Sequence, residues 1–355
     1  MAKDYFKRIN RLTPTRLWIN NPTTEEARKS IEAGAVSCTT NPTFCMKILQ
    51  KDESERDKVI SIIDEVIKET QDDNHAADVV QQRMTKEILD IFLPLYKKNP
   101  GNQGFVSIQG DPNMDTDTDH IIDEALRYRE LGDNFITKIP VTNAGLVALE
   151  ALIPEDMAMI ATEIMGISQA LATCEMYKKV SDACGKYPPL YLTHITGIFD
   201  EYLAQVVEDE GIDISSDALW QAGIIIARKQ YRIFKKRNYP GIMLGGGARG
   251  LHHFTEMVGS EMHVTINWTG AADRLIKENP PVEYHIFSPA SGKVVDELLD
   301  KIEVFRKAYA EDGLTVDEFA GFGPVAHFRG QFIEGWKYLL DTIGDRRDIN
   351  SQKQE

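Results

Sequence analysis

The chain has 355 residues, 42% of them hydrophobic and 27% charged, so it holds enough apolar material for a large folded core. Its formal net charge of -15 argues against nucleic acid or an anionic membrane surface as a main partner. The four cysteines form no CxxC pair and no Cys/His metal spacing, and no apolar run approaches the ~20 residues of a membrane span. Because no apolar secretory segment opens the sequence, we expect a reduced, cytoplasmic protein.

Short β-like runs alternate with amphipathic helical segments along the chain. The predicted strands are residues 17–20, 36–41, 105–109, 135–140, 158–164, 190–195, 242–246 and 264–267. Helices are predicted between them, for example over 24–33, 119–131, 167–183 and 219–231. This alternation predicts an α/β fold in which the strands close into a (β/α)8 TIM barrel. An open doubly wound sheet is the alternative, although no dinucleotide fingerprint follows the first strand.

The remaining length extends this barrel. We expect a helical insertion over residues 46–98, between strands two and three, and C-terminal helices over residues 290–345. Residues 346–355 are charged, and we expect this tail to be frayed. No internal repeat or linker divides the chain, so residues 1–345 are predicted to form a single domain.

One charged residue lies inside an apolar predicted strand. Lys138 stands between Phe135-Ile136-Thr137 and Ile139-Pro140, a composition typical of a covered sheet. Burial lowers the pKa of a lysine, and the neutral amine is the nucleophile that Schiff-base formation with a carbonyl substrate requires. The alternative is a lysine that is paired with a carboxylate or that extends past the strand end.

In a parallel barrel, the carboxyl ends of the strands carry the chemistry. Most of the residues predicted there have side chains that can form hydrogen bonds, and one of them, a histidine, ordinarily titrates near neutral pH. They are Asn20, Thr39, Thr40, Asn41, Gln109, Lys138, Thr162, His194, Arg249 and Asn267. This set suits carbonyl chemistry through an imine, and it lacks the clustered histidines and carboxylates of a metal hydrolase.

Several stretches resemble the transaldolase family: Leu17-Trp18-Ile19-Asn20, Thr39-Thr40-Asn41-Pro42-Thr43, Val106-Ser107-Ile108-Gln109 and the ten residues from Ile136 to Gly145. The resemblance implies that Lys138 forms the Schiff base and that a dihydroxyacetone unit passes from a ketose to an aldose, without cofactor or metal. Compact members of the family instead release or capture the free ketone, so an aldolase or lyase is the second interpretation. The insertion and the tail resemble those of the longer members.

The chain departs from the family pattern at catalytic positions. Asn20 replaces an Asp that handles the proton of the C4 hydroxyl, and an amide cannot accept that proton. Gln109 replaces a Glu that works through a water, and the aldolase-like members of the family also have Gln at this position. Thr162 matches the water-holding Thr, whereas Ile160 replaces a substrate-contacting Asn. A catalytically altered relative with a binding role is therefore a third interpretation.

Two neighbours of these positions are candidates for proton transfer. His194 aligns with an aromatic position, and it either takes over proton transfer from the missing carboxylate or is a hydrogen-bonded wall residue. Glu163 follows Thr162, and strand alternation predicts that it points away from the barrel interior if Thr162 points inward.

The resemblance also implies an anion site after strand seven. Arg249 matches a phosphate-binding Arg, but Gly247 replaces a Ser and Gly197 replaces a second Arg. Either the substrate carries less charge, or His252, His253 or Arg329 supplies a cation, although Arg329 is better explained as structural. We expect a small sugar or sugar-phosphate-like substrate that contacts Thr40, Asn41, Gly247, Arg249 and Asn267. The sequence leaves the oligomeric state open.

Overall fold

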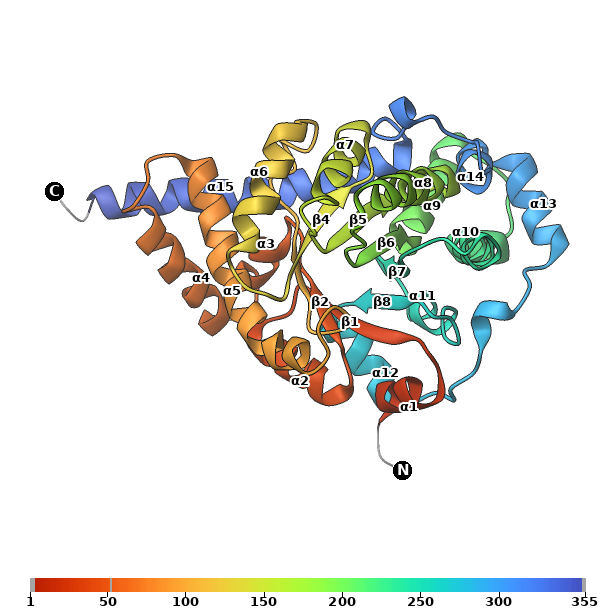
Figure 1. Ribbon diagram of the computed structural model, residues 1–355, viewed down its shortest axis with the longest axis horizontal. Coiled ribbons are helices and arrows are strands. Elements are labelled where there is room, and N and C mark those ends of the chain that lie inside the picture. The colour runs from red at the N-terminus through yellow and green to blue at the C-terminus, as the bar shows by residue number, and fades with distance from the viewer. Residues whose placement is uncertain (1–3, 52, 353–355) are drawn as a thin grey trace.

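The computed structural model describes residues 4–51 and 53–352. In this part of the chain, parallel strands close into a barrel in sequence order. Figure 1 shows the strands among the surrounding helices. The strands are β1 (Arg16–Asn20), β2 (Ser37–Thr39), β3 (Val106–Ile108), β4 (Phe135–Pro140), β5 (Met159–Ile164), β6 (Leu190–Ile195), β7 (Ile242–Gly246) and β8 (His263–Ile266). The predicted (β/α)8 barrel is therefore confirmed, with strand boundaries shifted by a few residues at most.

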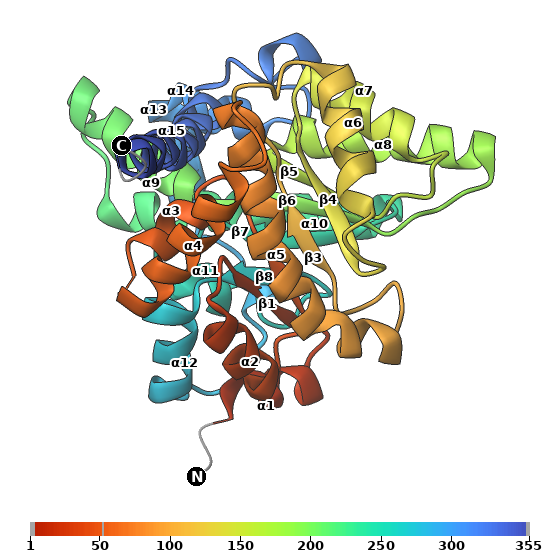
Figure 2. The same cartoon turned by 90° about the vertical axis from the view of Figure 1, so that its left-hand side faces the viewer.

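Helices surround the barrel (Figure 2). None of the helices in residues 4–51 and 53–352 combines the length and apolarity that a membrane crossing needs. They are α1 (Tyr5–Leu12), α2 (Thr24–Ala33), α3 (Phe44–Leu49), α4 (Glu53–Val66), α5 (Asp73–Lys98), α6 (Thr118–Arg129), α7 (Asn143–Leu152), α8 (Ile167–Cys184), α9 (Thr196–Glu210), α10 (Ser216–Arg237), α11 (His252–Thr255), α12 (Asp273–Glu278), α13 (Gly292–Lys301), α14 (Glu303–Tyr309) and α15 (Gly323–Gln352).

Large apolar side chains fill the part of the barrel interior that lies nearer the amino ends of the strands. The cluster consists of Trp18, Phe105, Ile136, Ile160, Tyr191 and Leu244. Because Ile160 belongs to this packed layer, its apolar side chain is accounted for by the core. The filled layer makes the barrel a core rather than a pore, so a ligand reaches the interior only from the carboxyl ends of the strands.

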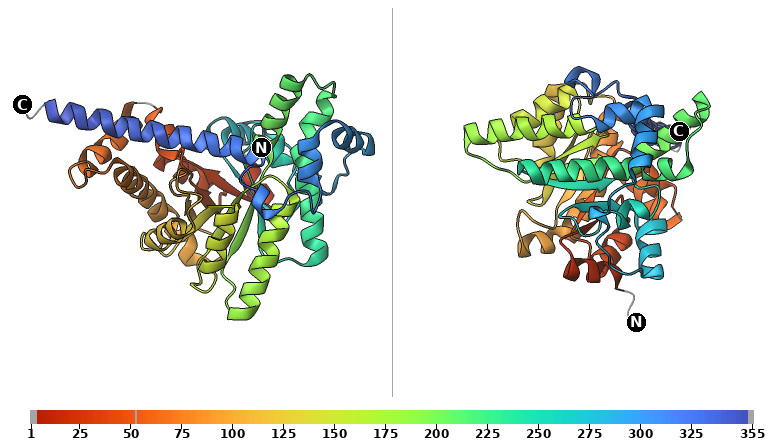
Figure 3. Two further views of the ribbon diagram at one scale, coloured as in Figure 1. Left: turned by 90° about the horizontal axis from the view of Figure 1, so that it is seen from above. Right: turned by 90° about the vertical axis from the view of Figure 1, so that its right-hand side faces the viewer.

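Helix α15 extends from the barrel to the C-terminal end and appears as the long blue helix in Figure 3. It packs against α3, α4, α5 and α9. Arg346 pairs with Asp64 at 2.6 Å and Arg347 with Asp73 at 2.6 Å, which ties the end of α15 to the inserted helices. The expected frayed tail is therefore wrong for residues 346–352, which are helical, and residues 353–355 lie outside the described part.

Candidate active site

The carboxyl ends of the strands open into a cavity of about 440 Å³. Strand ends, the loops after β7 and β8, and helices α3 and α15 together form its wall. Of the residues that the sequence predicts for the site, the cavity is lined by Asn20, Thr39, Asn41, Lys138, Gly247, Arg249 and Asn267. Thr40, Gln109, Thr162 and His194 do not line it.

Lys138 extends from β4 into this cavity, and only 7% of the residue is exposed. Its Nζ lies 5.6 Å from the centre of the Phe332 ring, which α15 places over the barrel mouth. No described residue forms a hydrogen bond or ion pair with this nitrogen, in contrast to the paired lysine considered from the sequence. Burial lowers the pKa of Lys138, and Lys47 adds to this effect, while Glu163 opposes it.

Strand β5 contains a bulge beside Lys138. Ala161 pairs with Leu192, but the next pair joins Ile164 to His194, so two residues of β5 lie opposite Thr193. The extra residue is Glu163, whose φ of +60° is rare for a residue other than glycine. A bulge of this kind turns neighbouring side chains toward the same face of a sheet. The expectation that Glu163 points away from the interior is therefore wrong.

The bulge brings Glu163 to the end of β3. Gln109 Nε2 donates a hydrogen bond to Glu163 Oε1 at 2.8 Å, and Glu163 is only 1% exposed. Burial raises the pKa of Glu163, and the nearby Asp115 raises it further, whereas Gln109, Lys138 and Arg329 act in the opposite direction. Gln109 and Thr162 thus lie beside this buried carboxyl rather than on the cavity wall.

Arg329 has the structural role preferred from the sequence. Its Nε donates to both carboxylate oxygens of Asp115, at 2.8 and 2.9 Å, and its Nη2 donates to the carbonyl of Pro112 at 3.0 Å. These contacts join α15 to the loop between β3 and α6, above Glu163.

His194 lies on the outer face of β6, which fits the wall residue of its two expected roles and not the catalytic one. Its Nε2 lies 3.3 Å from the carbonyl of Gly223 in α10, and the residue is fully buried. The inward position belongs to its neighbour Thr193, which lines the cavity. Burial lowers the pKa of His194 to about 4, so the ring is neutral near physiological pH. His194 is therefore a wall residue that packs against a helix.

Thr40 also differs from expectation. Its Oγ1 donates to the carbonyl of Ser107 at 2.6 Å, so it joins β2 to β3 and does not face the cavity. Asn41 reaches the cavity, but its Oδ1 accepts hydrogen bonds from Asn21 and from the backbone and side chain of Thr43. This oxygen therefore mainly holds the loop after β2.

Asn20 lies in a polar network across β1, β2 and β8. Its Nδ2 donates to Asn267 Oδ1 at 2.9 Å, and its Oδ1 accepts from Thr39 Oγ1 at 3.0 Å. Thr39 Oγ1 in turn lies 2.7 Å from Thr265 Oγ1. Such a network can orient substrate hydroxyl groups, but at neutral pH none of its members accepts a proton.

Cationic side chains also line the cavity. Arg249 donates to Glu201 and, at 3.1 Å, to Gln331 Oε1. Lys47, from α3, also lines the cavity, and burial together with the nearby Arg249 lowers its pKa to about 8. Lys47 was not predicted, although its place about one turn into the helix that follows strand two could have indicated it.

Close backbone packing explains the glycines at the predicted anion site. A Cβ on Gly197 would lie 2.4 Å from the carbonyl oxygen of Gly247 and 2.5 Å from the nitrogen of Arg249. At Gly247, φ is +65° and a Cβ would lie 2.7 Å from Ile195 and from Ile198. The start of α9 and the loop after β7 therefore touch, and this contact leaves no room for the missing Ser and Arg side chains.

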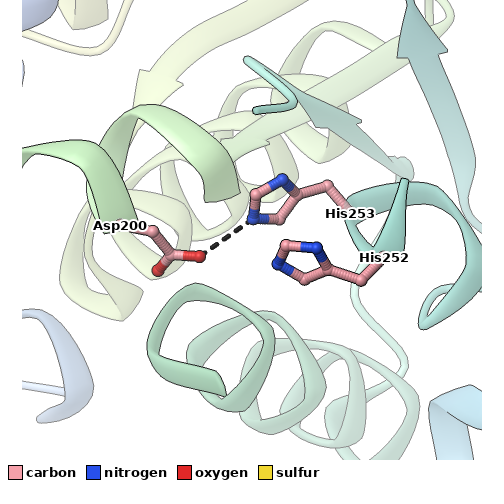
Figure 4. Close-up of side chains that lie close together, drawn as sticks. All are labelled: Asp200, His252 and His253. Carbon is pink, nitrogen blue, oxygen red and sulfur yellow. Dashed lines mark hydrogen bonds and ion pairs between the residues drawn. The ribbon is translucent and has the colours of Figure 1, made fainter. Parts of the chain in front are cut away.

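One group of possible metal ligands occurs among the described residues: Asp200, His252 and His253, whose ligand atoms lie within 4.8 Å of one another (Figure 4). His253 Nδ1 accepts hydrogen bonds from the backbone of Arg249 and Gly250, so the proton is on Nε2, which donates to Asp200 at 2.9 Å. A metal at Nε2 would have to displace this proton. Asp200 and His253 instead hold the loop that contains Arg249, and neither His252 nor His253 lines the cavity.

A family model described as Transaldolase/Fructose-6-phosphate aldolase matches residues 17–309, a range that runs from β1 through α14. This chain belongs to that family. The match covers every strand of the barrel and the insertion, so the transaldolase resemblance of the sequence motifs is confirmed.

Curated relatives carry the name transaldolase at low identity. The chain is 27% identical over 168 residues to a protein of Trichodesmium erythraeum. This alignment covers 42% of this chain and 44% of the relative. It is 24% identical over 246 residues to one of Thiobacillus denitrificans, covering 64% and 66%. It is 24% identical over 296 residues to one of Chlamydia caviae, and this alignment covers 81% of this chain and 83% of the relative. Less than two thirds of the first two relatives is therefore spanned.

Within this transaldolase-family barrel, the sequence missed one functional candidate and misplaced another. Lys47 lies in a helix that was assigned to the insertion, and Glu163 was assigned to the wrong face. The only sequence signal for Glu163 is its position directly after Thr162, because the bulge itself has no signature in the sequence.

Proposed function

We propose that this protein is a transaldolase-like enzyme that transfers a dihydroxyacetone-type unit between small sugars through a Schiff base on Lys138. The observation that carries the proposal is the position of Lys138, which is buried, lines the cavity and has no ion-pair partner among the described residues. Its lowered pKa increases the fraction of neutral amine near neutral pH, and the neutral amine attacks a carbonyl.

The reaction begins when Lys138 Nζ attacks the ketose carbonyl and water leaves to form an imine. The C4 hydroxyl group then loses its proton to a water molecule in the cavity, the bond between C3 and C4 breaks to release an aldehyde, and the electron pair moves toward the imine nitrogen to form an enamine. An acceptor aldehyde captures the enamine, and hydrolysis of the new imine releases the product. The hydroxyl groups of the sugar are oriented by Asn20 and Asn267, which are already hydrogen-bonded to each other.

An anionic group on the substrate is supported by the charges of the cavity. Although the chain carries a net charge of -15, the cationic side chains of Lys47 and Arg249 line the cavity beside the reactive amine of Lys138. Glu334 at the rim is exposed, and the Glu201 carboxylate already pairs with Arg249. Attraction to such a cluster favours a phosphorylated or similarly charged sugar over a neutral one.

An aldolase that releases or captures the free ketone is the second candidate function. The amide of Gln109 favours it, because the aldolase-like members of the family also have Gln at this position. Incubation of the enzyme with a ketose and no acceptor separates the two functions. Release of free aldehyde at the full rate supports the aldolase, whereas release that depends on an added aldose supports the transferase.

Borohydride trapping tests the central proposal. Reduction with borohydride in the presence of a panel of ketoses, with and without phosphate, should give a stable adduct and irreversible inactivation. Lys138→Met should form no adduct. Lys47→Met, which removes another amine that lines the same cavity, is the matched control and should still be trapped, with weaker binding of charged ketoses. An adduct that survives in Lys138→Met would refute the proposal.

A further inference from the structure

Buried polar atoms remain unpaired beside Lys138, where β5 bulges. Gln109 holds Glu163 Oε1 through the hydrogen bond of 2.8 Å, and Thr162 precedes Glu163 in the bulge. Among the described residues, Glu163 Oε2, Gln109 Oε1 and Thr162 Oγ1 have no hydrogen-bond partner. Buried polar atoms in proteins almost always bind a partner, so these three are suited to bind water or substrate oxygen.

We propose that Glu163 donates and accepts the proton of imine formation at Lys138, in place of the strand-three carboxylate that Gln109 replaces. This inference rests on the proposed function of Lys138. The side-chain amide of Gln109 cannot act as an acid near neutral pH, so Gln109 serves to position Glu163. Because Glu163 and Lys138 form no direct ion pair, the proton travels through the substrate oxygen or one bound water.

The proton balance of the step requires such a group. Lys138 Nζ forms a bond to the carbonyl carbon, and the proton that the nitrogen loses passes to the oxygen, which gives a carbinolamine. Glu163 then donates its proton to the hydroxyl group, which leaves as water while the nitrogen lone pair forms the C=N bond. The products are a positively charged imine and a carboxylate, which stabilise each other. Hydrolysis of the imine runs these transfers in reverse.

The surroundings of Glu163 keep its proton available. The charged groups that face it are Lys138 from β4, Asp115 from the loop after β3, and Arg329 from α15, while Gln109 is neutral. Burial raises its pKa toward neutrality, and Asp115 adds to this effect. A carboxyl group that is partly protonated near neutral pH is an effective general acid, whereas an ordinary exposed Glu is fully ionised.

The backbone of the bulge also indicates function. Glu163 has a φ of +60°, a conformation that side-chain-bearing residues rarely adopt and that clusters at active sites. A residue that only fills the core needs neither this conformation nor a carboxyl group. The strain turns the side chain toward Gln109 and Lys138, where a regular strand would direct it outward.

Glu163→Gln separates proton transfer from structure, because the new amide oxygen can still accept the hydrogen bond from Gln109. We expect the rate of borohydride trapping and kcat to fall about 100-fold or more. If Glu163 acted only through its charge, the change would have the opposite sign. Removing a negative charge would lower the pKa of Lys138, increase the neutral amine and speed up trapping.

The exchange variant Gln109→Glu/Glu163→Gln is the second arm, because it returns a carboxyl group to the same hydrogen-bonded pair. It should recover about tenfold or more of the lost trapping rate. His194→Leu, which alters a buried titratable residue outside the cavity, is the matched control and should trap at the wild-type rate. Circular dichroism checks that each variant is folded.

Three results would overturn the inference: a Glu163→Gln variant within about threefold of the wild type, an exchange variant no faster than Glu163→Gln, or faster trapping in Glu163→Gln. If the variant does not fold, the pH dependence of trapping in the wild-type protein decides. A loss of trapping above the raised pKa of Glu163, at pH values where the amine of Lys138 is neutral, supports the inference. A rate that only rises with pH contradicts it. A wild-type protein that forms no adduct would refute the proposed function as well.

Discussion

A lysine buried without a counter-ion costs folding free energy, because its charged form is poorly solvated in the interior. Lys138 is in this position, and the similarly sized Met side chain has no charge to desolvate. Lys138→Met should therefore raise the free energy of unfolding near neutral pH by ~0.5–2 kcal/mol while it abolishes trapping. Chemical denaturation of the two proteins measures this difference.

The pH dependence of this gain has a defined sign. The folded pKa of Lys138 is lowered, so between that value and the ordinary lysine pKa the unfolded chain binds more protons. The wild type should gain stability as pH rises through this window, and the advantage of Lys138→Met should shrink. An advantage that stays constant up to alkaline pH would show that the burial of charge is not its cause.

At the level of single residues, the sequence predicted the cavity only in part. Lys138, Asn20 and Asn267 were found because regular strands alternate and end where turn residues begin. Glu163 was considered but assigned to the wrong face for the same reason, since one extra residue in β5 reverses the alternation beyond it. The sequence left two roles open for His194, because a motif alignment gives its strand, whereas its face depends on the register.

Helix α15 closes the mouth of the barrel with Phe328, Gln331 and Phe332. Phe332 is 1% exposed, and its ring shields Lys138 Nζ from water. The sequence predicted this last helix, but its path across the mouth depends on contacts with α3, α5 and α9, which are distant in the chain. A helical pattern does not reveal such contacts.

Phe332→Ala tests the shielding by α15. The loss of the ring should destabilise the fold by about 3–5 kcal/mol, the usual range for a buried Phe. Water should then reach Lys138, so the pKa of this residue should move back toward its ordinary value and trapping near neutral pH should slow. The rate of trapping as a function of pH measures this shift, which should move the profile to higher pH. An unchanged profile in a folded variant would mean that α15 does not shield the amine.

Across the whole molecule, the insertion and the C-terminal helix stabilise each other. Arg346 pairs with Asp64 on α4, and Arg347 contacts Asp73 and donates to the carbonyls of Ile67 and Thr70 at 3.0 and 2.8 Å. These contacts lie far along α15 from the residues that cover Lys138. Global stability and the chemistry of the site are therefore separable in this region.

The variant Arg346→Ala/Arg347→Ala tests this separation. We expect a loss of about 1–3 kcal/mol in unfolding free energy, since partly exposed ion pairs contribute little and the hydrogen bonds to carbonyls somewhat more. The pH profile of trapping should be unchanged, because the cover over the cavity is retained. Thermal melting and trapping, measured on the same sample, check both expectations. A changed profile would show that the end of α15 communicates with the site.

The most direct test of the central claim is peptide mass spectrometry of the wild-type protein after borohydride reduction with a ketose. Lys138 and Lys47 lie in the same cavity, and burial lowers the pKa of both, so the position of the adduct separates two chemically similar amines. The structure predicts that the reduced sugar is attached to Lys138 alone. An adduct on Lys47, or none with any ketose, would contradict it.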